Sequence, residues 1–534
     1  MNKKFILFSV GKLLEILSYL LIVPAFIAFF EIQPRTFPGI IFDCRLTGFI
    51  VAIITSFMCG SVLKAFGKRE LTGTGIREGF AIVTFGWFSL TLFGCIPLMT
   101  YFLSQADIVT AGTVIRALTD AYFEIMSGFT TTGATIITNI ERLPQGILFW
   151  RSLTHWLGGM GIITLAIAIL PAFGIAGYQM FRGEVPGPTA ERLKPRLAET
   201  AKILWGTYVL LTLIEAVLLK AGGMTIFDAL CHSFGTMATG GFSTKSASIG
   251  SYNSAYIEWV VIIFMLFAGM NFVIHYRILF SRKFDLLRSN RELHFYAAVI
   301  LIAIVLSTVI LHTRGIASRD QVGRSFRSRP LSERALEEKI AAEKRKIDSF
   351  PDTLRHAAFQ VVSITTTTGY CTADFDIWPN FIRYMLVVLM FFGGCAGSTG
   401  GGMKMVRIMV VIKSAWREIK TIIQPRIIAP IKIAKKTIDE RQVANIGGFI
   451  ALFLGFFVIS SLAMSFFIED ITTSFTTVAA TMCNIGPGLS GIGATENYAW
   501  IPLSGKWVLV LCMLLGRLEI YTVLIALSPV SWKK

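Results

Sequence analysis

The sequence predicts an all-α integral membrane protein in which four pseudo-symmetric span–pore helix–span repeats surround a central pore, preceded by two extra N-terminal spans. Three observations predict this. Apolar residues make up 54% of the 534 residues and charged residues only 16%, whereas soluble proteins carry about a quarter charged residues. Several windows of about twenty residues are almost purely apolar, long enough to cross a bilayer core of about 30 Å. A short pattern of small residues recurs four times between such windows.

The apolar windows set the number of spans. Clear examples are residues 5–30, 40–63, 80–102, 257–280 and 447–467. The first run is too long for a cleavable signal peptide and leads directly into a second span. We expect ten spans and four re-entrant helices in all. The predicted units are two N-terminal spans (1–70) and four repeats (71–180, 181–290, 291–425 and 426–534).

The recurring pattern carries a marker glycine in each repeat. The four copies are Thr131-Thr132-Gly133-Ala134, Ala238-Thr239-Gly240-Gly241, Thr367-Thr368-Gly369-Tyr370 and Asn484-Ile485-Gly486-Pro487. The marker glycines Gly133, Gly240, Gly369 and Gly486 are separated by 107, 129 and 117 residues. The preceding segments, 120–130, 227–237, 353–366 and 471–483, are too short to cross a membrane alone. They are expected to enter and return, which requires burial in protein or contact with a water-filled path.

Four such loops around one axis suggest a selectivity filter. Rings of backbone carbonyls replace the hydration shell of a bare cation, and glycine permits dihedrals that a Cβ disfavours. An ordinary turn would explain any single copy, but four copies in register favour a filter. The predicted ion-binding residues are Thr131, Thr132, Gly133, Ala238, Thr239, Gly240, Thr367, Thr368, Gly369, Asn484, Ile485 and Gly486. Glycine at all four marker positions favours potassium over sodium.

A second glycine cluster interrupts an apolar span of the third repeat. The segment 393–402 contains Gly393, Gly394, Gly397, Gly400, Gly401 and Gly402. Each glycine costs a helix about 1 kcal/mol relative to alanine. We interpret the segment as a flexible gate loop below the filter, with close helix packing as the alternative. Arg517 lies in mid-span, where a charge is costly. It is expected either to face the pore as an electrostatic barrier or to form a structural ion pair, with Glu519 or with a residue of another helix.

Other polar residues receive more ordinary predictions. Asp120 and Asp228 are expected to cap their pore helices, or to raise the cation concentration at the pore mouth. Glu124 is expected to be a buried hydrogen-bonding support. His155 and His232 lack metal-ligand spacing and are interpreted as hydrogen-bonding residues. The eight cysteines show neither a metal motif nor a disulfide framework.

The formal net charge of +17 lies in short loops between spans, which is the signature of positive-inside topology and argues against nucleic-acid binding. Both termini are therefore expected to be cytoplasmic and the four filter loops to face outward. One segment disagrees, because the predicted extracytoplasmic loop 313–350 is rich in basic residues. Its alternating charges around 333–345 predict a solvated helix.

These motifs together closely resemble the TrkH/TrkG branch of the Trk/Ktr/HKT cation-transporter superfamily. The matching stretches are 127–135, 156–163, 240–244, 393–402, 484–488 and 516–519, and they span nearly the whole chain in order. The resemblance implies potassium uptake across the bacterial inner membrane by a homodimer with one pore per protomer. It also implies gating by the glycine loop, with Arg517 facing the permeation path, and regulation by a cytoplasmic TrkA-like nucleotide-binding subunit.

We place the candidate docking surface for that subunit at residues 413–441. Potassium would be the transported ligand, without a covalent cofactor. A sodium-conducting relative, or a sodium- or proton-coupled potassium symporter, remains the alternative. An intramembrane enzyme would need a nucleophile–base pair or metal ligands at membrane depth, and no such constellation occurs in the sequence. A membrane scaffold would have no use for four filter-like loops.

Overall fold

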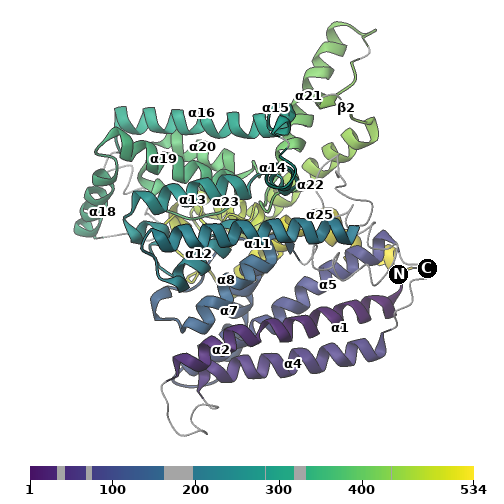
Figure 1. Ribbon diagram of the computed structural model, residues 1–534, viewed down its shortest axis with the longest axis vertical. Helices are drawn as coiled ribbons and strands as arrows, with labels where there is room; N and C mark the ends of the chain where they lie inside the picture. The colour runs from purple at the N-terminus through teal and green to yellow at the C-terminus, as the bar shows by residue number, and fades with distance from the viewer. Residues whose placement is uncertain are drawn as a thin grey trace.

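The structure is a computed structural model that describes residues 1–32, 43–67, 75–161, 197–282, 284–317, 332–427, 429–433 and 436–533. Across these ranges the regular structure is almost entirely helical (Figure 1). The sheet found there is a small antiparallel hairpin of β1 (Lys432–Ile433) and β2 (Lys436–Thr437). The predicted all-α class is confirmed.

The N-terminal unit consists of two spans that cross at small residues. The first is a broken helix, α1 (Lys3–Leu20) with α2 (Ile22–Glu31), and the second is α4 (Cys44–Phe66). A Cβ added at Gly11 would lie 2.5 Å from Gly60 O, and one added at Gly60 would lie 2.7 Å from Gly11 O. The absence of side chains at both positions therefore lets the two backbones approach, as in small-residue helix pairs of membrane proteins.

The described helices can be assigned in order to the four predicted repeats, each with a first span, a pore helix and a second span. The first spans are α5 (Ile76–Gly94) with α6 (Ile96–Ser104), α11 (Leu197–Ala221), α16 (Arg291–Arg314) and α22 (Glu440–Ser465). The pore helices are α7 (Ala111–Phe129), α12 (Ile226–Met237), α19 (Phe350–Thr365) and α23 (Ile471–Met482). The second spans are α8 (Gln145–Gly159), α13 (Ala255–Ala268) with α14 (Phe272–Leu279), α20 (Asn380–Met390) with α21 (Met405–Ile423), and α24 (Leu503–Leu518) with α25 (Ile520–Leu527).

The remaining helical elements connect these parts. They are the helices α15 (Asp285–Ser289), α18 (Glu333–Lys346) and α26 (Pro529–Trp532), and the 3-10 turns η1 (Ile140–Arg142), η3 (Ser248–Tyr252), η4 (Phe375–Ile377) and η5 (Ser490–Ile492). Both chain termini lie at one end of the molecule and α18 lies at the other (Figure 1). This arrangement agrees with the predicted extracytoplasmic position of α18, while the assignment of sides stays a prediction.

The second spans of the second, third and fourth repeats are broken near their middles. The axis bends by 105° between α13 and α14 and by 112° between α24 and α25. In the third repeat the glycine segment separates α20 from α21. Six described helices are long and apolar enough to span a membrane, or up to eight if each bent pair is one span. The predicted total of ten spans also counts α8 and the α20–α21 pair, and it stays a prediction.

The pore helices begin at side chains other than those predicted. Their N-caps are Thr110, Thr225, Ser349 and Asp470, each accepting a hydrogen bond from a backbone N–H of the first turn. The predicted capping roles of Asp120 and Asp228 are therefore wrong. Asp120 lies inside α7 and pairs with Lys506 at 2.6 Å. Asp228 lies in the first turn of α12 and accepts a hydrogen bond from Thr244 Oγ1 at 2.5 Å.

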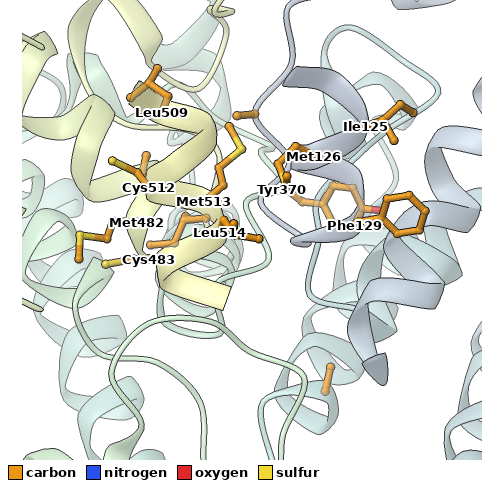
Figure 2. Close-up of a cluster of buried hydrophobic side chains, with 14 of the residues drawn as sticks. Ile125, Met126, Phe129, Tyr370, Met482, Cys483, Leu509, Cys512, Met513 and Leu514 are labelled. Atoms are coloured by element: carbon orange, nitrogen blue, oxygen red, sulfur yellow. The ribbon is translucent and has the colours of Figure 1, made fainter. Parts of the chain in front are cut away.

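The cores of the first and fourth repeats pack large apolar side chains behind their pore helices. Figure 2 shows Met126 of α7 and Met513 of α24 between these two helices, while the Phe129 ring packs edge-on against Trp87 and Trp150, with ring centroids 6.3 and 6.1 Å apart. Trp150 of α8 is fully buried and donates its indole N–H to Gly94 O at 2.9 Å. The pore helices are thereby surrounded by protein, which is what backbone ending at membrane depth requires.

Several predicted features fall partly outside the described residues. Two predicted boundaries lie there, at 70/71 and 180/181. So do the second span of the first repeat beyond Gly161 and residues 318–331 of the charged loop. The predicted helix in the rest of that loop is observed as α18. The division into five units stays a prediction.

We expect Gly60→Ala to lower the free energy of unfolding by about 1–3 kcal/mol, the usual cost of overpacking, because the new methyl group would meet the α1 backbone. Gly455→Ala is the matched control, since a Cβ there has nothing within 4 Å. Thermal unfolding of the purified proteins in detergent measures both. Equal stability of the two variants would contradict the close approach of α1 and α4.

Candidate functional site

The four loops that follow the pore helices share one backbone conformation. A non-glycine residue enters the left-handed region in each: Thr131 (φ 51°), Thr239 (φ 54°), Thr367 (φ 62°) and Asn484 (φ 55°). Two residues later a glycine does the same, with φ between 76° and 95°: Gly133, Gly241, Gly369 and Gly486. Such conformations cost a residue with a Cβ of order 1–3 kcal/mol and persist only where the surroundings impose them.

The hydrogen bonds of the four loops are equally regular. The N–H after each left-handed residue donates to the carbonyl five residues earlier. These bonds are Thr132 N to Ser127 O (2.9 Å), Gly240 N to Gly235 O (2.8 Å), Thr368 N to Ser363 O (2.8 Å) and Ile485 N to Ala480 O (2.8 Å). The bond satisfies a carbonyl at the end of the pore helix, as in helix C-caps of the Schellman type. The chain beyond it turns sharply away from the helix.

This regularity corrects the predicted register of the second loop. Gly241, and not Gly240, is the equivalent of Gly133, and Thr239 takes the place that the prediction gave to Ala238. Gly240 does not have a positive φ, and its small size is explained instead by His155, whose ring lies against it. Two consecutive glycines left the register ambiguous, and only the backbone dihedrals resolve it.

The four loops form a closed cycle. A Cβ added to the left-handed glycine of any loop would lie less than 3.0 Å from a carbonyl oxygen of the next loop. The pairs are Gly133 with Gly240 O, Gly241 with Thr368 O, Gly369 with Ile485 O, and Gly486 with Thr132 O. The fourth loop thus returns to the first, so the loops surround a common axis. The predicted filter residues are brought together by this cycle, apart from the one-residue shift in the second loop.

A buried ion pair supports the first loop. Glu124 of α7 and Arg151 of α8 approach to 2.7 Å and are at most 1% exposed. Glu124 Oε2 also accepts from Ile136 N at 2.9 Å, and the Arg151 guanidinium lies over the Phe242 ring, 4.1 Å from its centroid. The predicted support role of Glu124 is confirmed. Arg151 was missed, although an arginine within an apolar segment is a signal of function or structure.

Side chains also join neighbouring loops. The hydroxyl of Tyr370, just after the third loop, donates to the backbone of the second repeat, with His232 O at 3.1 Å and Phe242 O at 3.2 Å. Asn484 of the fourth loop donates to Thr132 Oγ1 of the first at 2.9 Å. His232 Nε2 lies 2.9 Å from Ser243 Oγ, as expected for a hydrogen-bonding residue. Movement of one loop is therefore opposed by its neighbours.

The predicted gate segment lies directly below these loops. Thr399 Oγ1 donates to Met237 O at 2.9 Å, at the end of the second pore helix. Gly401 N donates to Thr367 Oγ1 at 2.6 Å, in the third filter loop. Close backbone contact requires the glycines: a Cβ at Gly393 would meet Gly401 O, and one at Gly401 would meet Cys483 O. The segment therefore contacts the second and fourth repeats as well as other parts of the third repeat, to which it belongs.

Arg517 holds the same segment from the fourth repeat. Its guanidinium donates to Thr399 O at 2.7 Å and to Gly158 O and Gly159 O at 2.5 and 2.9 Å. The alternative of an Arg517–Glu519 pair is wrong, because Glu519 accepts from Arg407 at 2.8 Å. A fixed positive charge therefore lies beside the intramembrane segment, with its hydrogen bonds directed to carbonyl oxygens.

The site offers oxygen ligands of one kind. Within the described residues, no group of three or more His, Cys, Asp or Glu side chains could hold a metal ion. The four loops instead provide neutral backbone carbonyls and threonine hydroxyls, which are oxygen ligands able to replace the water of a monovalent cation.

Comparison with known proteins now decides the family. The family model described as TrkH, cation transport protein, matches residues 46–534. The chain belongs to the TrkH family of cation transport proteins. It is a membrane transporter and not an enzyme.

Relatives match along the full chain. The Trk system potassium uptake protein TrkH of Halomonas elongata is 36% identical over 100% of both chains, and the TrkH protein of Escherichia coli K12 is 35% identical over 98% of both. The crystal structure of the potassium transporter TrkH from Vibrio parahaemolyticus superposes with a TM-score of 0.80 at 33% identity, covering 100% of both chains. The TrkH fold is therefore shared along the whole sequence.

Charged residues of α18 lie against the third and fourth repeats. Lys339 of α18 pairs with Asp374 at 2.7 Å. Asp376, two residues further along the same connection, is buried and accepts from Ser490 N at 2.9 Å. Burial and the neighbouring Asp374 carboxylate raise the pKa of Asp376 to about 8. The connection between the third loop and α20 therefore holds a buried carboxyl group whose pKa is raised, although Arg383 lies 3.5 Å from it.

The cycle predicts that Gly369→Ala destabilises the protein more than Gly223→Ala. Both glycines have positive φ, 83° and 99°, but a Cβ at Gly369 meets Ile485 O whereas one at Gly223 has nothing within 4 Å. Both variants place a Cβ on a residue with positive φ, so they share the backbone strain. Only Gly369→Ala also brings that Cβ against a carbonyl oxygen. Thermal unfolding should show the larger loss for Gly369→Ala by about 1–3 kcal/mol. Equal losses would argue against the interlocked loops.

Asp376 predicts a pH dependence of stability. Its folded-state pKa is raised, so the folded chain holds a proton that the unfolded chain releases. This contribution is complete below the ordinary aspartate pKa and is lost as pH rises toward about 8. Asp376→Asn should flatten the decline of unfolding temperature between pH 5 and pH 8. If the unfolding temperature of the variant fell with pH as steeply as that of the unmodified protein, other groups would be responsible for the fall.

Proposed function

We propose that this chain carries out potassium uptake across the bacterial inner membrane, with the ions passing through the cycle of four filter loops. The observation that carries the proposal is the closed cycle itself, in which each left-handed glycine faces a carbonyl oxygen of the next loop. Dehydration of a cation is opposed by a large desolvation penalty. A ring of carbonyls offsets this penalty without adding a charge that would trap the ion.

Two further observations support potassium as the ion. None of the twelve residues from the left-handed residue to the glycine in each loop is charged, so binding depends on neutral dipoles suited to a weakly hydrated monovalent cation. Relatives aligned over the full length carry the name potassium uptake protein. The proposed ligands are the carbonyls of Thr131, Thr132, Thr239, Gly240, Thr367, Thr368, Asn484 and Ile485, which keeps the predicted set except for the shift in the second loop.

The intramembrane segment 393–402 is the proposed gate, held closed by Arg517. Support comes from its position below the loops and from the hydrogen bond between Arg517 and Thr399 O. Opening requires the segment to leave Met237 and Thr367 as well. The positive charge of Arg517 adds an electrostatic barrier to cations.

The assembly we propose is a homodimer in which each protomer has its own pore and both termini are cytoplasmic. A TrkA-like nucleotide-binding subunit would dock on the basic segment 413–441. Support for that surface comes from a hollow of about 610 Å³ lined by Lys413, Trp416, Arg417, Lys420 and Lys432. Four of these five side chains are cationic, which fits an acidic partner surface.

The test is ion flux in liposomes containing the purified protein, with potassium and sodium gradients set separately. Potassium flux should greatly exceed sodium flux. Gly369→Ser and Gly241→Ser should each lower the potassium-to-sodium ratio by about tenfold or more, because each distorts the carbonyl of the adjoining loop. Gly223→Ser is the matched control at a positive-φ glycine outside the filter. Equal potassium and sodium flux in the unmodified protein would refute selectivity, and unchanged ratios in both filter variants would refute the assigned filter.

A further inference from the structure

A single carboxylate joins the intramembrane segment to the helix that follows it. Glu292 Oε1 accepts from Ala396 N at 2.7 Å, within the segment, and from Val406 N at 3.2 Å, in the first turn of α21. Glu292 itself lies in the first turn of α16, and the N-cap Asn290 accepts from its backbone N–H at 3.0 Å. The first span of the third repeat therefore reaches across to hold the gate of the same repeat.

The contact closes the base of the segment. Gly393 N donates to Met403 O at 2.7 Å and Met405 N to Gly394 O at 3.2 Å, so the two arms of the segment run together. Glu292 adds a charged acceptor to this base. One oxygen serves N–H groups that are ten positions apart in sequence, so the arms cannot separate while both bonds remain.

The neighbouring charged groups form their hydrogen bonds and ion pairs with residues other than Glu292. Lys404, which is buried, donates to Gly400 O within the segment. Arg407 pairs with Glu519 at 2.8 Å, and Arg517 donates to Thr399 O and to the first repeat. Glu292 thus contributes the carboxylate at the base, whereas Arg517 contributes the cation at the tip.

The position of α21 gives this carboxylate a mechanical role. In Figure 1 the start of α16, next to α15, lies beside the base of α21, and α21 projects out of the helical bundle past β2. Val406 belongs to α21, and Ala396 belongs to the gate segment. Glu292 thus joins the first turn of α21 directly to the segment.

We propose that Glu292 is the latch through which movement of α21 is transmitted to the gate segment. While α21 is in its present position, Glu292 holds Ala396 and Val406 together and the segment stays below the filter. When α21 moves, the carboxylate loses Val406 N, and the base of the segment is free to open. This inference rests on the proposed gating function of segment 393–402. It makes Glu292 a positioning residue, because it acts through the segment and does not touch the ion.

Potassium flux into liposomes that contain the full chain without a cytoplasmic subunit tests the latch. Glu292→Ala should raise this basal flux at least about tenfold, which corresponds to about 1.4 kcal/mol and matches the loss of hydrogen bonds to a charged acceptor. Glu292→Gln keeps an acceptor oxygen without its charge and should give a smaller rise. Glu338→Gln, at an exposed glutamate of α18, is the matched control and should leave the flux unchanged.

A second measurement reports the segment directly. Cys395 lies next to Ala396 and is 1% exposed, so its reaction with N-ethylmaleimide, followed by peptide mass spectrometry, detects displacement of the segment. Glu292→Ala and Glu292→Gln should both speed this reaction, and Glu338→Gln should not. A lost contact that mattered only for stability would lower the unfolding temperature without exposing Cys395 in the folded protein.

Arg517→Ala separates failure of the latch from failure of the gate. If Arg517→Ala raises flux and Cys395 labelling while both Glu292 variants leave them unchanged, the gate stands and the latch is refuted. If none of the three variants changes flux or labelling, the proposed gate itself is refuted. A fall in flux in Glu292→Gln with a normal unfolding temperature would also overturn the latch, since it would mean that the carboxylate favours the open state.

Discussion

The closed contact between glycine and carbonyl around the four loops is the constraint on which the rest of the structure depends. Each left-handed glycine approaches a carbonyl of the next loop so closely that any Cβ would collide. The cycle leaves room for no side chain at these four positions and requires φ values that favour glycine. Because the fourth loop meets the first, a displacement of any one loop would shift the loops on either side of it. Four sequences that differ in most residues thereby keep one backbone conformation.

Holding backbone in this form at membrane depth requires support from every side. Carbonyl groups at the ends of the pore helices accept hydrogen bonds from some of the loop N–H groups. Buried side chains, among them Tyr370 and Asn484, join one loop to the next. The Glu124–Arg151 pair is a costly way to provide support, because two charges must leave water, but it connects the first loop to the second repeat. Below the loops, the broken second spans leave the space that the segment 393–402 occupies. The proposed ion path and the proposed gate are thus built from adjoining parts of the chain.

The sequence was sufficient to predict the helical membrane class of the fold and the register of three of the four loops that share one backbone conformation, because apolar windows and recurrent small residues reflect physical limits that act locally. The predictions that were wrong have a common cause, because each depended on contacts between residues far apart in the sequence. The pair Gly240–Gly241 offered two registers, and only contacts with the adjoining loops select one. Asp120 and Asp228 stood near the expected helix starts, but the first pore helix begins ten residues before Asp120, at Thr110. Arg517 and Glu519 are neighbours in sequence, yet the break between α24 and α25 directs them to different partners.

The most direct test of the account is the position of a bound ion. A structure of the protein crystallised with rubidium, a heavy substitute for potassium, would locate the ion by its anomalous scattering. The account predicts peaks on the axis enclosed by the four loops, within coordination distance of carbonyls such as Thr132 O, Gly240 O, Thr368 O and Ile485 O. Strong peaks elsewhere in the membrane region, with none on this axis, would contradict it.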